Sequence, residues 1–236
     1  GASWPANADG LYRGRVTVGQ AVAHSLNPVA VRILDELGIE KSFSFAHDTL
    51  GIRSLIPAEG NQFHDLTLSS LALGQQSRGV TVRELTAAYT VFLEGLYRTP
   101  VSYHRVLDRE GKVLLENKPA TESDRVLSTE NAALMTRLLT TVTTEGTAAR
   151  YITVTENLGI EVAGKTGTTQ NNCDRWFVGY TPRLLGGVWM GYDLPAELRG
   201  IERNPCVGIW DELTAVCEGL YRGAPPKAAF DLPDTL

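Results

Sequence analysis

The stretch GIEVAGKTGTT, residues 159–169, decides the fold because it fits two incompatible patterns. A glycine, four further residues and then Gly164-Lys165-Thr166 satisfy the phosphate-binding pattern G-x-x-x-x-G-K-[ST]. Such a loop works because a glycine-rich turn feeds directly into a helix whose amides face the phosphates. Here an alternating apolar run occupies 160–163, and β-branched and turn-forming residues follow Lys165. We therefore interpret the stretch as a strand that ends in Lys-Thr-Gly.

A P-loop NTPase stays open as an alternative. Asp193 follows an apolar run, as the magnesium-binding aspartate of such an enzyme does. No alternation of strands and helices accompanies it, and that alternation is what a nucleotide-binding sheet requires.

The composition is that of an ordinary globular protein. The 236 residues are 43% hydrophobic and 21% charged, which suffices for one sizeable domain or two small ones. The net charge is −5 and the basic residues are scattered, so we expect no nucleic-acid partner. No apolar run approaches the ~18 residues of a membrane span, and the first residues do not resemble a signal peptide. The lack of an initiating Met predicts a processed chain or a piece of a longer one.

The cysteine and histidine spacings predict no metal site. The four histidines and the three cysteines show no ligand spacing. If one helix holds Cys206 and Cys217, they lie about 16 Å apart along it, too far for a disulfide. We expect at least one free thiol, and small buried side chains for all three cysteines, Cys173 included.

Helix signals dominate the first 150 residues. Capping boxes begin at Thr17 and Thr81, and a helical stretch is expected at 40–50. Asn27 precedes a proline, so a helix starts there with Asn27 as its expected cap. Ser128 caps another helix. Its predicted buried side holds Leu134, Met135, Leu138, Leu139 and Val142.

Strand signals dominate the rest of the chain. A short hairpin is expected around 108–111, and a closing helix from Pro205 to about Leu220. Apolar runs of period two, joined by short links, predict an antiparallel meander over 160–168, 175–181 and 184–192. We predict an α+β fold and a single domain over 1–236, mostly helical in 1–150, with the meander and closing helix in 151–236.

The Lys-Thr-Gly strand is suited to binding the end of a peptide. An edge strand can lend its free amides to an extended backbone, and Lys165 with nearby hydroxyls can receive a carboxylate. Ser25-Leu26-Asn27 stands at the junction of two helices, where short polar side chains project from both.

At this point the sequence resembles the transpeptidase domain of class A penicillin-binding proteins. The resemblance covers nearly all of the chain, through RGRVTVGQAVAHSLNPVAVRILDELGIE, LTLSSLALGQQSRGVTVRELTAAYTVFLEGLYRTP, TEGTA, GKTGTT, DRWFVGYTP and WMGY. It implies the penicillin-binding transpeptidase or serine β-lactamase-like fold, a helical subdomain with an antiparallel sheet. That superfamily carries the motifs Ser-x-x-Lys, Ser-x-Asn and Lys-Thr-Gly.

The resemblance assigns catalytic roles to Ser25, Asn27 and Lys165. Ser25 would relay a proton, and Lys165 would supply positive potential. Asn27 would hydrogen-bond the substrate amide or order the lysine side chains.

The same resemblance assigns substrate binding to Thr166, Gly167, Thr168 and Thr169. The hydroxyls of Thr166 and Thr168 would receive a terminal carboxylate, and the Thr168 amide would donate to the oxyanion. Gly167 would let the strand approach the ligand.

The attacking serine is the one part that is not found. No serine of this chain has a lysine three residues on, and the resemblance places that motif upstream of Gly1. We therefore expect the upstream segment to be a necessary partner and this chain alone to be inactive. Without the family's serine-bearing helix, or something in its place, apolar surface on the remaining helices would be exposed.

The implied reaction is D,D-transpeptidation of peptidoglycan stem peptides ending in D-Ala-D-Ala, through a serine acyl-enzyme. This reaction needs neither a metal ion nor an organic cofactor. β-Lactam antibiotics would mimic the substrate. The resemblance also implies an extracytoplasmic location, with membrane attachment only through an N-terminal anchor outside this sequence. A non-catalytic binding domain on the same fold is the second alternative, beside the NTPase.

Overall fold

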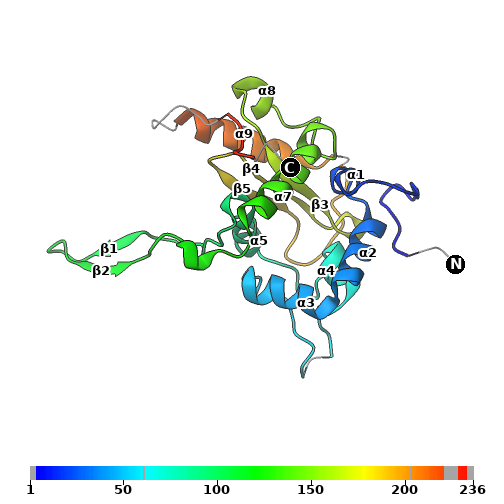
Figure 1. Cartoon of the computed structure of the whole chain (residues 1–236), viewed down its shortest axis with the longest axis horizontal. Coiled ribbons are helices and arrows are strands. Elements are labelled where there is room, and N and C mark those ends of the chain that lie inside the picture. Colours follow the sequence, from blue (N-terminus) through cyan, green and yellow to red (C-terminus); the bar gives the residue numbers. More distant parts are fainter. Residues whose placement is uncertain (1–3, 61, 202, 221–227, 233–236) are drawn as a thin grey trace.

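The computed structural model describes residues 4–60, 62–201, 203–220 and 228–232. Helices cover both faces of a three-stranded antiparallel sheet, so the predicted α+β fold is confirmed (Figure 1). The helices are α1 Val18–Ala23, α2 Asn27–Leu37, α3 Ile39–Ser44, α4 Leu68–Leu73, α5 Val82–Ala88, α6 Val91–Glu94, α7 Thr129–Thr144, α8 Val154–Leu158 and α9 Pro205–Leu220. A π-helical turn, Phe45–Thr49, extends α3. Two 3₁₀ turns lie at Glu122–Asp124 and Gln170–Asn172.

The sheet has the predicted meander order β3-β4-β5. Its strands are β3 Ala163–Thr168, β4 Arg175–Tyr180 and β5 Leu185–Met190. Thr166 continues β3, and the next helical turn begins only at Gln170. The P-loop interpretation is therefore wrong, because Gly164, Lys165 and Thr166 stand within a strand and do not lead into a helix whose amides could face phosphates. Within the described residues β3 has a strand on one side only, which leaves its other edge open.

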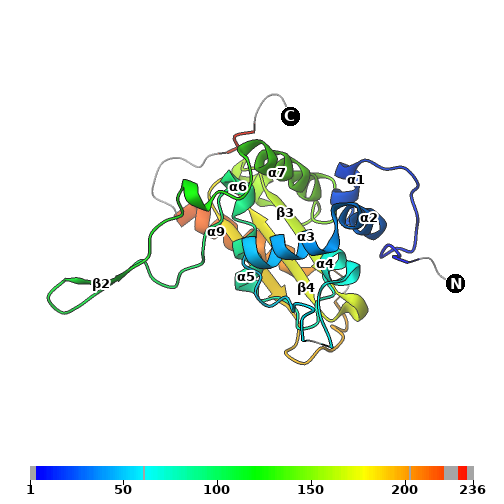
Figure 2. The same ribbon diagram turned by 60° about the horizontal axis from the view of Figure 1, so that its bottom comes forward.

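Two apolar layers hold the sheet between helices. On one face Trp210 of α9 packs edge-on against Phe177 and donates to the carbonyl of Gly186 at 3.1 Å. On the other face the Tyr180 hydroxyl meets Thr136 of α7 at 2.9 Å, beside the buried Leu139. α7 packs against β3, and α1 packs against α7 (Figure 2). This stack places the end of α1 beside the open edge of β3.

Most of the predicted helix starts are confirmed. Both capping boxes form, at Thr17 and Thr81, and Ser128 caps α7. The predicted hairpin forms from β1 Arg105–Leu107 and β2 Val113–Glu116, and it projects from the body with its side chains exposed (Figure 1).

Two expectations about the helices need correction. Asn27 is not a cap: Leu26 holds that position without a side-chain hydrogen bond. Leu134 is 44% exposed, because α7 turns its small residues and Leu139 towards β3. The helix that begins after Thr81 is short, because α5 ends at Ala88 and α6 begins separately at Val91. The sequence analysis also missed α4 and α8, which are only six and five residues long.

The cysteines agree in part with the prediction. All three are free. Only Cys206 is buried, and burial raises the pKa of its thiol to about 11. Cys217 is exposed and Cys173 is half-buried, so the expectation of three buried side chains is wrong for these two.

Apolar side chains are exposed on the helical part, as the resemblance led us to expect. Ile33 and Leu37 of α2 are 46% and 52% exposed, and Phe45 is 39% exposed. None of the helices in the described ranges is both long and apolar enough to cross a bilayer.

A buried carboxylate joins α8 to α9 and gives the first prediction. Asp211 accepts from the amides of Thr153 and Val154, each at 2.8 Å, and from the Thr153 hydroxyl. Asp211→Ala leaves these donors buried, so we expect a loss of about 3 kcal/mol in the free energy of unfolding, measured in urea. Glu212→Ala, on the exposed side of the same helix, is the control and should change it by under about 0.5 kcal/mol. Equal losses would contradict the assignment.

Candidate active site

The turn that carries Ser25 ends α1 in a left-handed conformation. The Leu26 amide donates to Ala21 O at 2.9 Å and the Ser25 amide to Val22 O at 3.2 Å, the two bonds of a Schellman motif. Ser25 has a φ of 54°, where glycine is the usual residue. A side chain at this position costs about 1 kcal/mol. Its hydroxyl is therefore the feature that distinguishes Ser25 from the glycine that the turn prefers.

The structure brings Ser25 to Lys165, 140 residues away in sequence. The Lys165 ammonium donates to Ser25 Oγ at 2.8 Å and to the carbonyl of Thr166 at 2.9 Å. Because Ser25 Oγ accepts this bond, its own proton is left to donate to another group. Two of the three residues with expected catalytic roles are thus in contact.

Burial lowers the pKa of Lys165 to about 8. Desolvation disfavours the ammonium, and no carboxylate of the described residues forms an ion pair with it. A partly dehydrated cation without a carboxylate is an attractive site for an anionic ligand.

Asn27 lies beside the pair but does not join it. Its side-chain amide donates to Ala6 O at 2.8 Å, and its backbone amide donates to Asn7 Oδ1 at 3.0 Å. No hydrogen bond within the described ranges links Asn27 to Lys165. Asn27 instead holds the N-terminal segment against the start of α2, and it faces a pocket.

The strand residues line the open edge of β3. The Thr166 hydroxyl is 2.6 Å from that of Thr147, and Thr168 is exposed at the end of the strand. Gly167 is opposite Trp176 of β4, and a Cβ on Gly167 would lie 3.0 Å from the Trp176 Cβ. Packing against Trp176 behind the strand thus favours glycine at position 167, in addition to the role expected for Gly167 in front of the strand.

Thr169 is held by its neighbours. Its hydroxyl donates to the Asp174 carboxylate at 2.8 Å and accepts from the Asp174 amide at 2.9 Å. The other oxygen of Asp174 accepts from the Trp189 indole at 2.8 Å. With its proton donated to Asp174, Thr169 closes the β3–β4 turn instead of presenting a free donor.

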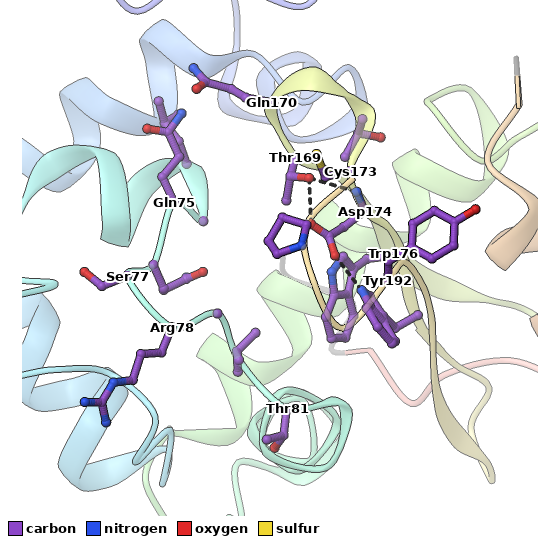
Figure 3. A pocket seen from close by; sticks show the side chains of 18 of the residues that line it. Gln75, Ser77, Arg78, Thr81, Thr169, Gln170, Cys173, Asp174, Trp176 and Tyr192 are labelled. Carbon is purple, nitrogen blue, oxygen red and sulfur yellow. Dashed lines mark hydrogen bonds between the residues drawn. The ribbon is translucent and has the colours of Figure 1, made fainter. Parts of the chain in front are cut away.

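A pocket of about 1100 Å³ extends from this end of β3. Figure 3 shows Thr169, Asp174, Trp176 and Tyr192 on one side, and Gln75, Ser77, Arg78 and Thr81 on the other. The pocket continues the open edge of the strand, so an extended ligand along β3 would enter it. In the described part of the chain no cluster of His, Cys, Asp and Glu could hold a metal ion.

Sequence reasoning missed Thr147 and Asp174 as parts of the site. Both stand in segments that carry the family resemblance, TEGTA and DRWFVGYTP. No local pattern distinguishes them, because Thr147 acts on Thr166 across 19 residues.

Comparisons with known proteins agree with the resemblance that the sequence motifs indicate. The sequence model described as "Penicillin binding protein transpeptidase domain" matches residues 3–195. The chain belongs to the penicillin-binding protein transpeptidase family. The resemblance noted from the sequence motifs is thereby confirmed.

Curated relatives of this transpeptidase-family chain include two named penicillin-binding proteins. "Penicillin-binding protein 1A" of Aquifex aeolicus is 36% identical over 237 aligned residues, which cover 99% of the chain and 30% of the relative. "Penicillin-binding protein 1F" of Bacillus subtilis is 35% identical over 196 residues, 80% of the chain and 25% of the relative. The chain thus spans less than a third of the length of these relatives.

Solved structures share the fold. Penicillin-binding protein 1A from Haemophilus influenzae has a TM-score of 0.72 at 20% identity, over 94% of this chain and 37% of that one. The D,D-transpeptidase domain of a peptidoglycan glycosyltransferase from Eggerthella lenta has a TM-score of 0.68, also at 20% identity, over 90% and 56%. At this identity the likeness establishes the fold of the family.

The left-handed turn predicts an order of stability at position 25. Ser25→Gly removes the hydroxyl and relieves the conformation, whereas Ser25→Ala removes the hydroxyl and keeps the strain. We expect the glycine variant to be more stable than the alanine variant by about 1 kcal/mol in thermal or urea unfolding. Equal stability of the two variants would show that the turn is not strained.

The lowered pKa of Lys165 predicts a pH-dependent stability. Between about pH 8 and 10.5 the unfolded chain binds the Lys165 proton more tightly than the folded protein, so stability rises with pH over this window. Lys165→Met removes the cost of burying the charge, and we expect it to stabilise the protein by about 1–2 kcal/mol at pH 7 and less at pH 10.

Urea unfolding at both pH values measures this difference. Lys112→Met in the exposed hairpin is the matched control, expected to change stability by under about 0.5 kcal/mol at either pH. A Lys165→Met variant that is destabilised at pH 7, or equally stabilised at both pH values, would contradict the prediction.

Proposed function

We propose that this chain is the substrate-binding part of a serine D,D-transpeptidase that cross-links peptidoglycan stem peptides. The observation that carries the proposal is the 2.8 Å hydrogen bond from Lys165 to Ser25 at the open edge of β3. This hydrogen bond places the Ser-x-Asn and Lys-Thr-Gly motifs next to each other. Family membership supports the same reaction class.

The open edge of β3 would bind the D-Ala-D-Ala end of a stem peptide as an added strand. The protonated Lys165 and the hydroxyls of Thr166 and Thr168 would receive its terminal carboxylate. The Thr168 amide would donate to the carbonyl oxygen that becomes negative in the tetrahedral intermediate.

The attacking hydroxyl would come from outside residues 1–236, because no serine of the chain has a lysine three residues on. A serine of a Ser-x-x-Lys motif would attack the peptide carbonyl and form an acyl-enzyme, with release of D-Ala. Ser25 accepts from Lys165 and keeps its own proton free, so it suits a relay between the attacking serine and the leaving amine. The amine of a neighbouring stem would then attack the acyl-enzyme and complete the cross-link.

Three finer statements belong to the proposal. β-Lactams would acylate the same serine, and the chain alone would be inactive. The whole protein would act outside the cytoplasm, anchored in the membrane through another segment. Residues 1–236 would form one part of a single domain, with the Ser-x-Asn motif in the mostly helical part, 1–150, and the Lys-Thr-Gly strand in 151–236.

A fluorescent penicillin tests the proposal. We expect label that survives denaturation only when the chain is mixed with a separately produced segment that carries Ser-x-x-Lys. Label on the chain alone would mean that one of its own serines attacks. No label, although the two parts associate, would favour a non-catalytic binding domain on this fold.

The same labelling experiment, repeated with the Lys165→Gln variant, tests the role of the lysine. Loss of the cation is expected to slow acylation at least about 100-fold, which corresponds to about 2.7 kcal/mol. The rate should also fall as the pH rises through about 8, where Lys165 loses its proton. Lys112→Gln should acylate at the unsubstituted rate, and an unchanged rate for Lys165→Gln would contradict the role of Lys165.

A further inference from the structure

The turn Glu145-Gly146-Thr147-Ala148 touches both halves of the proposed site. It follows α7, and Ala148 at its end is fully buried. The roles described above leave this turn without an assignment, although it contacts the α1 turn and the β3 strand.

Its first contact is with the end of α1. The Thr147 amide donates to Ala23 O at 3.1 Å, and Ala23 is the last residue of α1. A Cβ on Gly146 would lie 2.3 Å from the same oxygen, so only glycine allows this approach. Because Ser25 stands two residues after Ala23, this bond fixes the position of the Ser25 turn.

Its second contact is with the Lys-Thr-Gly strand. Thr147 Oγ1 lies 2.6 Å from Thr166 Oγ1, and either hydroxyl can donate. Two hydroxyls that share one hydrogen bond retain one further proton to donate. A carboxylate accepts and does not donate, so a bound carboxylate favours the arrangement in which Thr147 donates to Thr166 and Thr166 donates to the ligand.

We propose that Thr147 is a positioning residue of the transpeptidase site, an inference that rests on the proposed function. Its backbone amide holds the turn that carries Ser25. Its hydroxyl directs the proton of Thr166 towards the carboxylate of the substrate or of a β-lactam. One residue thereby sets the geometry of both motifs.

The test uses the whole protein, with its Ser-x-x-Lys segment, and measures acylation rate constants. Each variant is acylated by a penicillin with a free carboxylate and by the same penicillin with that carboxylate masked as a methyl ester. Thr147→Val keeps the shape and the backbone amide but removes the hydroxyl. We expect it to slow the free-carboxylate reaction about tenfold and to leave the ester within about twofold, the effect of one hydrogen bond to a charged group.

Two variants serve as controls for the hydroxyl. Thr147→Ser restores it and should recover the rate for both penicillins to within about twofold. Thr144→Val makes the same substitution at an exposed residue whose hydroxyl donates to Thr140 O of its own helix, and it should leave both rates unchanged.

Gly146→Ala tests the backbone contact. The added methyl displaces the end of α1 and therefore Ser25, so we expect both penicillins to slow by the same factor. An unchanged rate for Gly146→Ala would overturn the role of the amide. Thr147→Val that slows both penicillins equally, or neither, would overturn the role of the hydroxyl. If the unsubstituted protein is not acylated at all, the proposed function itself fails, a result distinct from each of these.

Discussion

The hydrogen bond from Lys165 to Ser25 is the interaction on which the rest of the site depends. It requires a lysine on an open strand edge and a serine on a helix-ending turn to meet from positions 140 residues apart. The stack of β3, α7 and α1 brings the two residues together, since α7 packs against both β3 and α1. The site is thus a product of the core packing and does not depend on a mobile loop.

Two local costs are concentrated at this contact. Ser25 adopts a backbone conformation that favours glycine, and the Lys165 ammonium is partly buried with no ion pair to a carboxylate among the residues that the structure describes. Such departures from local preference are typical of functional sites, where surrounding packing holds residues that would otherwise relax. The desolvated cation and the free proton of Ser25 are what make the corner suitable for an anionic ligand.

The sequence predicted those features whose cause is short-range. The capping boxes at Thr17 and Thr81 and the alternation of the meander need only neighbouring residues. Asn27 was misjudged because its amide is bound by Ala6 and Asn7, a tertiary contact that overrides its capping preference. Leu134 was misjudged because the buried side of α7 is set by its fit against β3.

The candidate site could be predicted from the sequence only where a short motif marks its residues. The motifs identified Ser25 and Lys165, and the structure brought them together. Thr147 and Asp174 could not be found, because their partners lie on other elements and no spacing encodes them. The resemblance assigns Thr169 to substrate binding, but its hydroxyl donates to Asp174 within the β3–β4 turn, a contact that the motif does not encode.

A crystal structure of the whole protein acylated by a penicillin tests the central claim most directly. The account predicts the acyl group on a serine outside residues 1–236, with its carboxylate within hydrogen-bonding distance of the Thr166 and Thr168 hydroxyls and its carbonyl oxygen on the Thr168 amide. An acyl group bound away from the open edge of β3, or attached to Ser25, would contradict it.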